Sequence, residues 1–209
     1  LDLYEDALLE RKQIPTAEEI GAVLETVDYR SIDATRTSIS IGDNQKITLG
    51  GIAKGYAVDR GMQTLLEAGI KSAIVEAGGD MRIAGKKTME RDWHIAIQNP
   101  RDPDDYIARI RAPNMAVVTS GDYERYYDPE RLYHHIIDPL TGRSATELVS
   151  VTVVAKTAFD ADAISTAAFV LGRERGLALV ESLGDVEALL ITRTQMVIKS
   201  SGWGSFEVE

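Results

Sequence analysis

The chain has 209 residues, of which 44% are hydrophobic and 27% are charged, so it is long enough for one domain or a tightly fused pair of lobes. Its 23 Lys and Arg residues against 33 Asp and Glu residues give a net charge of −10, which argues against a protein that binds nucleic acid through phosphate contacts. With no cysteine, it has no disulfide scaffold, thiolate zinc site, iron–sulfur cluster or cysteine nucleophile.

The first half of the chain is predicted to contain two helices and a hairpin. The expected elements are an irregular charged lead-in over residues 1–15, a helix over 17–27, a hairpin of 37–41 with 45–48, and a helix that follows Gly51 and ends at Gly69. Thr16 and Glu19 have the spacing of a capping box, which predicts the start of the first helix. The second helix is predicted from an apolar stripe made by Val58, Met62, Leu65 and Leu66.

The second half mixes strands and helices without strict alternation. The expected elements are strands over 72–76 and 93–98, a Pro/Asp turn region over 99–105, strands over 115–119, 133–137 and 149–155, helices over 161–171 and 174–183 separated by Gly172, and a closing hairpin of 189–192 with 196–200. This order predicts an α+β fold, a single mixed α/β unit with an antiparallel-rich sheet and flanking helices.

Four segments share a pattern in which an extended run ends abruptly in glycine and polar residues. They are Gly50–Gly55, Ala77–Asp80, Ser120–Asp122 and His135–Pro139. Glycine lets the backbone approach a ligand closely and offers N–H groups to anions, although each segment alone is more typical of a plain turn. Lys54 precedes the last glycine of the first segment, so this is no Walker loop. At a helix N-terminus Lys54 can hold a phosphate, or it can be a solvated lysine.

Asp162 and Thr166 are the sharpest candidate for a metal site. They are four residues apart on a predicted helix, so their oxygens share one face. A carboxylate with a hydroxyl or carbonyl is the oxygen donor set that Mg²⁺ prefers. The alternative is that Asp160 caps this helix and Asp162 is an acid of its first turn.

Two of the three histidines, His134 and His135, are adjacent on a predicted strand, where they point to opposite faces. One of them can face a ligand, and a shift of one residue in strand register exchanges the two. His94, in the strand over 93–98, is assigned no role.

Several motifs, taken in order, resemble the ApbE family of FAD:protein FMN transferases. They are Leu49–Asp59 (LGGIAKGYAVD), Glu76–Asp80 (EAGGD), Thr119–Arg125 (TSGDYER), Tyr133–Gly142 (YHHIIDPLTG), and Val151–Val153 (VTV) followed by Ala161–Ala167 (ADAISTA). Each motif alone is weak, whereas their common order is highly specific. The resemblance implies an ApbE-like flavin transferase domain over residues 1–209.

The chain departs from the family pattern in two places. The family normally has a segment before the position of Leu1 that supplies part of the flavin pocket, so we expect this chain alone to bind FAD more weakly and to expose an apolar lining. In addition, the first motif usually opens with Asp, and Thr48 stands in that place.

The resemblance implies that FMN passes from FAD to a Ser or Thr hydroxyl of a target protein, with release of AMP. It implies that the carbonyl of Gly51 and the side chains of Asp162 and Thr166 bind Mg²⁺. Asp162 and His135 are the candidate catalytic residues, His135 as the group that takes a hydroxyl proton. The residues expected to bind FAD are Lys54, Gly78, Gly79, Asp80, Ser120, Gly121 and Ile137.

Two other activities fit the same site: an FAD pyrophosphatase, in which water replaces the protein hydroxyl, and a non-catalytic flavin-binding protein. The expected partners are FAD and a flavin-acceptor protein, a subunit of a membrane redox complex, with no nucleic acid. Family resemblance suggests an extracytoplasmic, membrane-anchored full-length protein, although no signal segment opens this sequence and no apolar run reaches the ~20 residues that span a bilayer.

Overall fold

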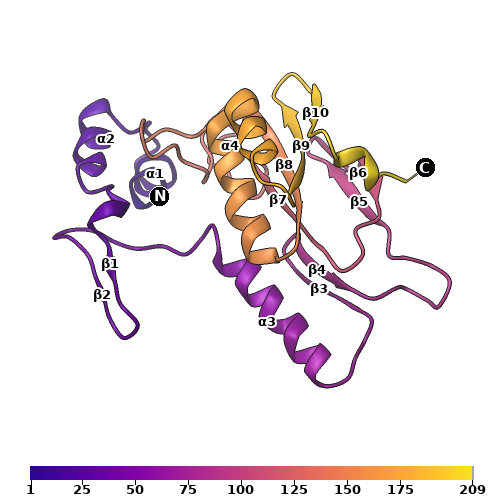
Figure 1. Ribbon diagram of the computed structural model, residues 1–209. Helices are drawn as coiled ribbons and strands as arrows, with labels where there is room; N and C mark the ends of the chain where they lie inside the picture. The colour runs from indigo at the N-terminus through magenta and orange to yellow at the C-terminus, as the bar shows by residue number, and fades with distance from the viewer. Residues whose placement is uncertain (209) are drawn as a thin grey trace. The chain divides into compact units, whose positions relative to one another are not determined.

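The computed structural model describes residues 1–208 and divides them into two compact units. Unit 1 comprises Leu1–Thr48 and Glu124–Ala145, and unit 2 comprises Leu49–Tyr123 together with residues 146–208. Each unit is therefore assembled from two separate stretches of the chain. Figure 1 shows the elements of both units in chain order.

Unit 2 is built on a six-stranded sheet with the order β10-β9-β8-β7-β4-β3, in which every neighbouring pair is antiparallel. The strands are β3 (Ala73–Ala77), β4 (Asp80–Ala84), β7 (Ala116–Gly121), β8 (Leu148–Ala155), β9 (Glu187–Thr192) and β10 (Val197–Lys199). The inner strand β8 is buried along its whole length, as its valine-rich sequence requires. The predicted mixed fold with an antiparallel sheet is confirmed.

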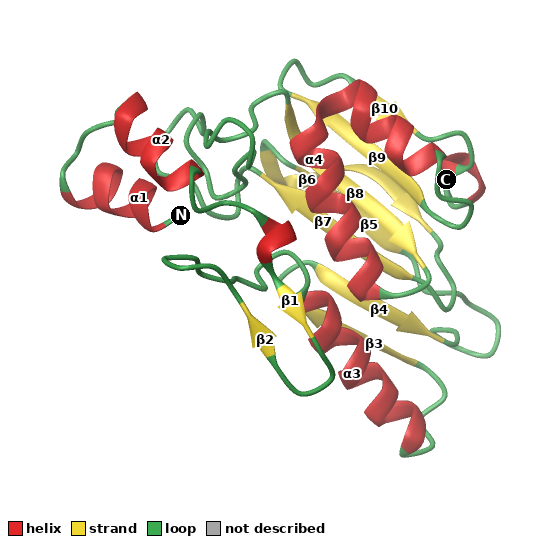
Figure 2. Cartoon of the chain, turned by 60° about the vertical axis from the view of Figure 1, so that its left-hand side comes forward, coloured by secondary structure: helices red, strands yellow, loops and turns green. Residues whose placement is uncertain are grey.

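Two helices pack on this sheet. α3 (Ala53–Glu67) contacts β3 and β4, and α4 (Ala158–Glu181) contacts β7, β8 and β9 (Figure 2). α4 is interrupted at Gly172, whose φ of 77° lies in the left-handed region that glycine adopts without strain. The predicted break at Gly172 is therefore confirmed.

A two-stranded ribbon of β5 (Ile95–Asn99) and β6 (Asp102–Ile110) contributes to the main core of unit 2. Val117 of β7 faces this core, whereas Ser120 contacts α4, because alternate side chains of a strand point to opposite faces. The core also contains Trp203 of the short helix η3 (Trp203–Ser205). The sheet thus lies between the ribbon and α4, which places the polar end of β7 beside α4.

Unit 1 consists of short elements and long loops. They are α1 (Asp2–Glu5), the π-helical turn η1 (Asp6–Glu10), α2 (Ala17–Leu24), the 3₁₀ turn η2 (Tyr29–Ser31), β1 (Asp33–Ala34) and β2 (Ile39–Ser40). Its two stretches are joined by a hydrogen bond of 3.0 Å from the Tyr4 hydroxyl to the Gly142 carbonyl and by the ion pair of Arg125 with Glu5. The capping box of α2 is confirmed, since Thr16 and Glu19 accept from each other's backbone N–H groups.

Two predictions for the N-terminal stretch are wrong. The lead-in over residues 1–15 is helical over α1 and η1, with Tyr4 and Ala7 buried. The hairpin is shifted, because β1 pairs with β2 and the turn lies at Thr35–Ser38, where the Thr35 hydroxyl accepts from the Ser38 amide. Gln45 instead joins loops, its side-chain amide donating to the carbonyls of Thr26 and Asp28.

Two further segments also differ from expectation. The turn region over 99–105 is shorter, since β6 begins at Asp102 and its Pro103 lies in a two-stranded ribbon that tolerates a missing N–H. The expected strand over 133–137 forms only isolated bridges, Tyr126 to His134 and Ile137 to Ser144. These contacts depend on tertiary partners that no local pattern indicates.

Within residues 1–208, none of the helices has both the length and the apolar character that crossing a bilayer requires.

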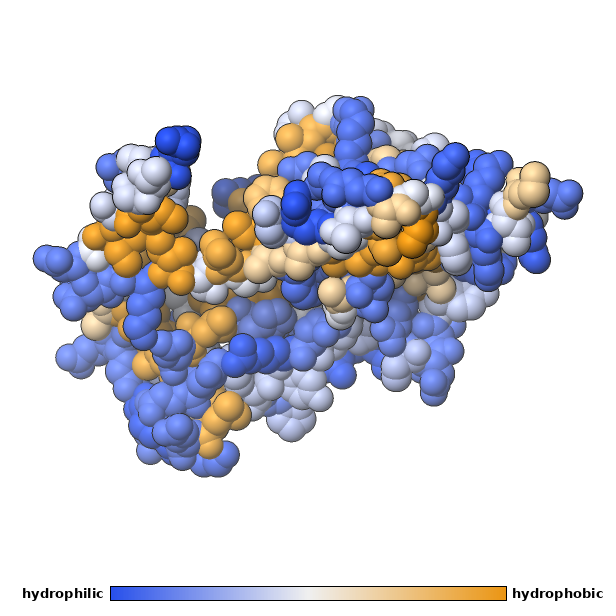
Figure 3. Space-filling view, turned by 90° about the horizontal axis from the view of Figure 1, so that it is seen from below, coloured by the Kyte–Doolittle hydropathy of each residue, from blue (hydrophilic) through white to orange (hydrophobic). Residues whose placement is uncertain are grey.

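Large apolar side chains are exposed on unit 1 (Figure 3, left). Five isoleucines of its first stretch are among them: Ile14, Ile32, Ile39, Ile41 and Ile47. Single exposed apolar residues are ordinary on protein surfaces, so these residues alone do not identify a pocket lining. The expected apolar lining of a flavin pocket stays a prediction.

Candidate functional site

The loop before α3 brings Gly51 against α4. The loop is tightly wound, because the Leu49 carbonyl accepts from the amides of Ile52 at 3.0 Å and Ala53 at 2.8 Å. A Cβ placed on Gly51 would lie 3.7 Å from the Thr166 hydroxyl oxygen, so the two residues are neighbours. Two of the three predicted metal ligands are thus side by side, although they are 115 positions apart in the sequence.

Asp162, the third predicted ligand, is buried at the start of α4. Its Oδ2 accepts a hydrogen bond of 3.0 Å from the Gly55 amide of α3, and the residue is 4% exposed. The alternative role is wrong in both parts: Thr157 caps α4, with its hydroxyl accepting from the Asp160 amide, and Asp162 lies beyond the first turn.

The surroundings of Asp162 fit a cation. Among residues 1–208, no Lys, Arg or His nitrogen lies within 4.0 Å of its carboxylate. A buried carboxylate is costly unless it is paired or binds a metal, and one amide donor satisfies only part of its four lone-pair positions. No three His, Asp or Glu side chains gather in this part of the chain, so a cation here would take one carboxylate together with hydroxyl and carbonyl oxygens.

A cluster of hydroxyl groups joins β7 to the same face of α4. The Ser120 hydroxyl lies 2.8 Å from that of Ser165 and 3.1 Å from that of Thr166. Ser120 was predicted to bind FAD, and Ser165 is an additional member that the motif contained but sequence reasoning did not single out. The structure therefore brings Ser120 into contact with the predicted metal ligand Thr166.

The close crossing of α3 and α4 depends on Gly55. A Cβ at this position would lie 2.2 Å from the Ala158 carbonyl oxygen and 2.9 Å from Cβ of Asp162. Gly55 is thus required by helix packing, so the glycine itself is not evidence of a ligand.

We expect Gly55→Ala to lower the free energy of unfolding by about 1–3 kcal/mol, the usual cost of overpacking. Chemical denaturation measures the effect. Gly21→Ala is the matched control, because Gly21 is a helical glycine with no heavy atom within 4 Å of an added Cβ, and we expect it to be neutral or stabilising. Equal stability of Gly55→Ala and wild type would contradict the close crossing.

Lys54 is anchored at the β3–β4 turn. Its Nζ lies 2.9 Å from Oδ1 of the buried Asp80 and 3.2 Å from the Gly78 carbonyl. Gly78 and Gly79 have φ values of 57° and 89°, as a two-residue hairpin turn requires, and Glu76 accepts from the Gly79 amide at 2.6 Å. Four predicted FAD-binding residues, namely Lys54, Gly78, Gly79 and Asp80, therefore form one cluster. Their contact with FAD stays a prediction.

The turn after β7 is held by an ion pair that sequence reasoning missed. Asp122 is fully buried and accepts from both Nη atoms of Arg101, at 2.7 and 2.6 Å, and Arg193 lies 3.5 Å away. A two-point pair of this kind fixes both partners in one plane. It ties the Ser120–Gly121 end of β7 to the tip of the β5–β6 ribbon. Arg101 lies in a segment predicted as a plain turn, so no sequence signal indicated its role.

The remaining candidates, His135 and Ile137, lie in unit 1. His135 Nδ1 is 3.1 Å from the Arg125 carbonyl, which can only accept, so Nδ1 carries the proton and Nε2 is the proton-accepting nitrogen. His134 is fully buried, with Nε2 at 2.9 Å from the Ala145 carbonyl and Nδ1 at 3.3 Å from the Ile136 amide. The adjacent rings thus have different environments, and the catalytic role of His135 stays a prediction.

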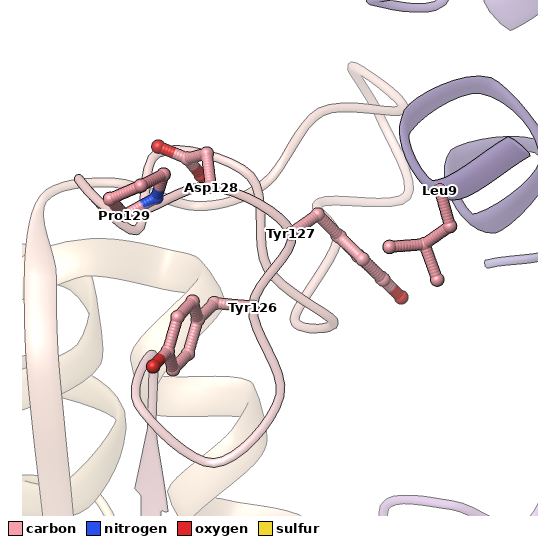
Figure 4. Close-up of a pocket in the computed structure, with 5 residues that line it drawn as sticks. All are labelled: Leu9, Tyr126, Tyr127, Asp128 and Pro129. Carbon is pink, nitrogen blue, oxygen red and sulfur yellow. The ribbon is translucent and has the colours of Figure 1, made fainter. Parts of the chain in front are cut away.

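An open hollow of about 400 Å³ also lies in unit 1. It is lined by Leu9, Tyr126, Tyr127, Asp128 and Pro129, and Figure 4 shows Tyr127 directed toward Leu9. Burial raises the pKa of Tyr127 above its usual value. None of the predicted site residues lines this hollow.

Comparisons with known proteins give one consistent result. The chain matches the ApbE family over residues 2–190. An FAD:protein FMN transferase of Vibrio cholerae is 35% identical over 199 residues, which cover 93% of this chain and 59% of that protein. One of Treponema pallidum is 33% identical over 213 residues, covering 92% and 59%.

Solved structures agree. The ApbE protein of Thermotoga maritima superposes with a TM-score of 0.87 at 38% identity, covering 94% of this chain and 65% of that one. The flavin transferase ApbE of Vibrio cholerae gives 0.81 at 33% identity, covering 92% and 63%. The chain spans about 59% of the length of these two curated relatives.

Proposed function

The chain belongs to the ApbE family, and from this premise we propose that it transfers FMN from FAD to a Ser or Thr hydroxyl of an acceptor protein, with release of AMP. The observation that carries the proposal is that the segment from Gly51 to Gly55 contacts α4 twice, Gly51 lying beside Thr166 and the Gly55 amide donating to Asp162. A buried carboxylate without a cationic side chain, next to a hydroxyl, supports a bound divalent cation there.

In the proposed reaction the acceptor hydroxyl oxygen forms a bond to the phosphorus of the FMN half of FAD. The bond from this phosphorus to the bridging pyrophosphate oxygen breaks, and its electron pair leaves with AMP. The hydroxyl proton passes to Nε2 of His135, which the Nδ1–H bond to the Arg125 carbonyl makes the accepting nitrogen. Mg²⁺, held by Gly51, Asp162 and Thr166, would supply charge stabilisation for the phosphate oxygens.

The other residues of unit 2 have binding roles in this proposal. Lys54 supplies an ammonium group. This group already donates to Asp80 and to the Gly78 carbonyl, so it is oriented before FAD binds. Ser120 and Gly121 lie on a strand end that the Arg101–Asp122 pair holds rigid. These contacts preorganise the nucleotide side of the site.

The test is incubation with FAD and Mg²⁺, with and without an acceptor protein that a relative flavinylates. We expect AMP, separated by chromatography, to appear only with the acceptor and to match the flavin fluorescence retained by the acceptor in a denaturing gel. AMP formed without the acceptor would identify a pyrophosphatase, and bound FAD without AMP would identify a flavin-binding protein.

We further propose that the acceptor is a subunit of a membrane redox complex and that the full-length protein acts outside the cytoplasm. Both statements rest on the family resemblance. Flavin labelling of such a subunit in cells, lost when this gene is deleted, is the measurement that tests them.

A further inference from the structure

α3 and α4 are joined near their N-terminal ends by hydrogen bonds in which a carboxylate of each helix accepts from backbone amides of the other. Asp162 of α4 accepts from the Gly55 amide of α3, and Asp59 of α3 accepts from the amides of Ala158 and Phe159 of α4, at 3.0 and 2.9 Å. The partners are four residues apart on each helix, so each exchange uses one helical face. Three hydrogen bonds therefore join the two helices near their N-terminal ends, which lie close together in Figure 1.

Both carboxylate oxygens of Asp59 take part in this contact. Each of its oxygens accepts one amide of α4, and Arg82 Nε lies 3.5 Å from its Oδ1. Arg82 is itself held by donating to the Asn114 carbonyl at 2.6 Å. Asp59 therefore already contacts a guanidinium group and two amide donors, whereas Asp162 contacts one amide and no cationic side chain. This makes Asp59 suited to hold the end of α4 in place and not to bind a ligand.

The consequence lies at the predicted metal ligands. Gly51 lies two residues before α3, and Asp162 and Thr166 follow the first turn of α4. The distance from the Gly51 carbonyl to these side chains therefore depends on the position at which α4 packs against α3. Asp59 supplies two of the three hydrogen bonds that hold this position.

We propose that Asp59 is a positioning residue for the divalent-cation site, acting through the first turn of α4. The inference rests on the proposed function, since it assumes that Gly51, Asp162 and Thr166 bind the cation. Asn at position 59 has one acceptor oxygen, and its NH₂ group would face the second amide, donor against donor.

The test is the affinity of the whole chain for Mn²⁺ alone, measured by titration calorimetry at a temperature where every variant is folded by circular dichroism. We expect Asp59→Asn to weaken Mn²⁺ binding by about tenfold or more, as the loss of partners that orient metal ligands usually does. Thr157→Ala is the matched control. It removes the cap of the same helix end without touching α3, so it should lower the melting temperature and leave Mn²⁺ affinity unchanged.

The outcomes separate the two proposals. If Asp59→Asn binds Mn²⁺ as wild type does, or if Thr157→Ala weakens binding equally, Asp59 has no positioning role while the metal site stands. If wild type binds no Mn²⁺, the metal part of the proposed function fails and the role of Asp59 fails with it. A selective loss in Asp59→Asn supports the proposal.

Discussion

Replacing Asp162 by Ala is expected to lower Mg²⁺-dependent AMP release by about a thousandfold or more. A bound metal supplies several kcal/mol of transition-state stabilisation, and each 1.4 kcal/mol is a factor of ten in rate. Asp162 is the one carboxylate of the predicted ligand set, so its loss removes the strongest cation ligand. Steady-state rates of AMP formation from FAD, measured against Mg²⁺ concentration, give the result.

Stability has to be separated from chemistry in this experiment, because Asp162 also accepts from the Gly55 amide. Asp162→Asn keeps an acceptor for that amide and removes only the charge, so it should melt near the wild-type temperature and still be inactive. Asp160→Asn, two residues away on the exposed side of α4, is the matched control and should be active. Full activity of Asp162→Asn, or of Thr166→Val, would leave these residues a structural role alone.

His135→Ala should slow FMN transfer by about 10²–10⁴-fold and change FAD affinity little, since a general base acts mainly in the transition state. The Nδ1–H bond to the Arg125 carbonyl gives the ring the tautomer that this role needs. Single-turnover rates and equilibrium FAD binding, measured on the same variant, separate the two effects.

His134→Ala is the comparison. Its ring is buried and bonded to two backbone groups, so its loss should lower stability by roughly 1–3 kcal/mol and slow transfer less than His135→Ala does. A larger loss of transfer rate in folded His134→Ala than in His135→Ala would exchange the two assignments.

Strong local signals in the sequence predicted most of the elements. The capping box at Thr16 and Glu19, the valine run of β8 and the helix break at Gly172 are all found in the structure. Each of these features depends only on residues that are close in the sequence, so tertiary packing does not alter the local structure that it predicts. β4 was missed because its five residues include Arg82 and no clear alternation, and its place is decided by pairing with β3 and β7.

The candidate site was also predictable only where local spacing determines it. Asp162 and Thr166 share a helix face by spacing, whereas the neighbourhood of Gly51 and Thr166 is a property of tertiary packing. Asp59 and Arg101 were missed because each acts on a partner at least 21 positions away, Asp59 on Ala158 and Arg101 on Asp122. An isolated acid or base in a helix or turn gives no sequence signal of such a partner.

The divided make-up of unit 1 has a consequence for synthesis on the ribosome. Tyr4 and Glu5 are made before their partners Gly142 and Arg125, and at about 5–20 residues per second the interval is roughly 10 s. During that time the first stretch of unit 1 has no second stretch to pack on, so side chains that the folded unit buries, such as Tyr4 and Ala7, stay open to solvent and to other nascent chains. Unit 1 is therefore the part of the protein that must close a long loop late, and it is where we expect a chaperone to act on the growing chain.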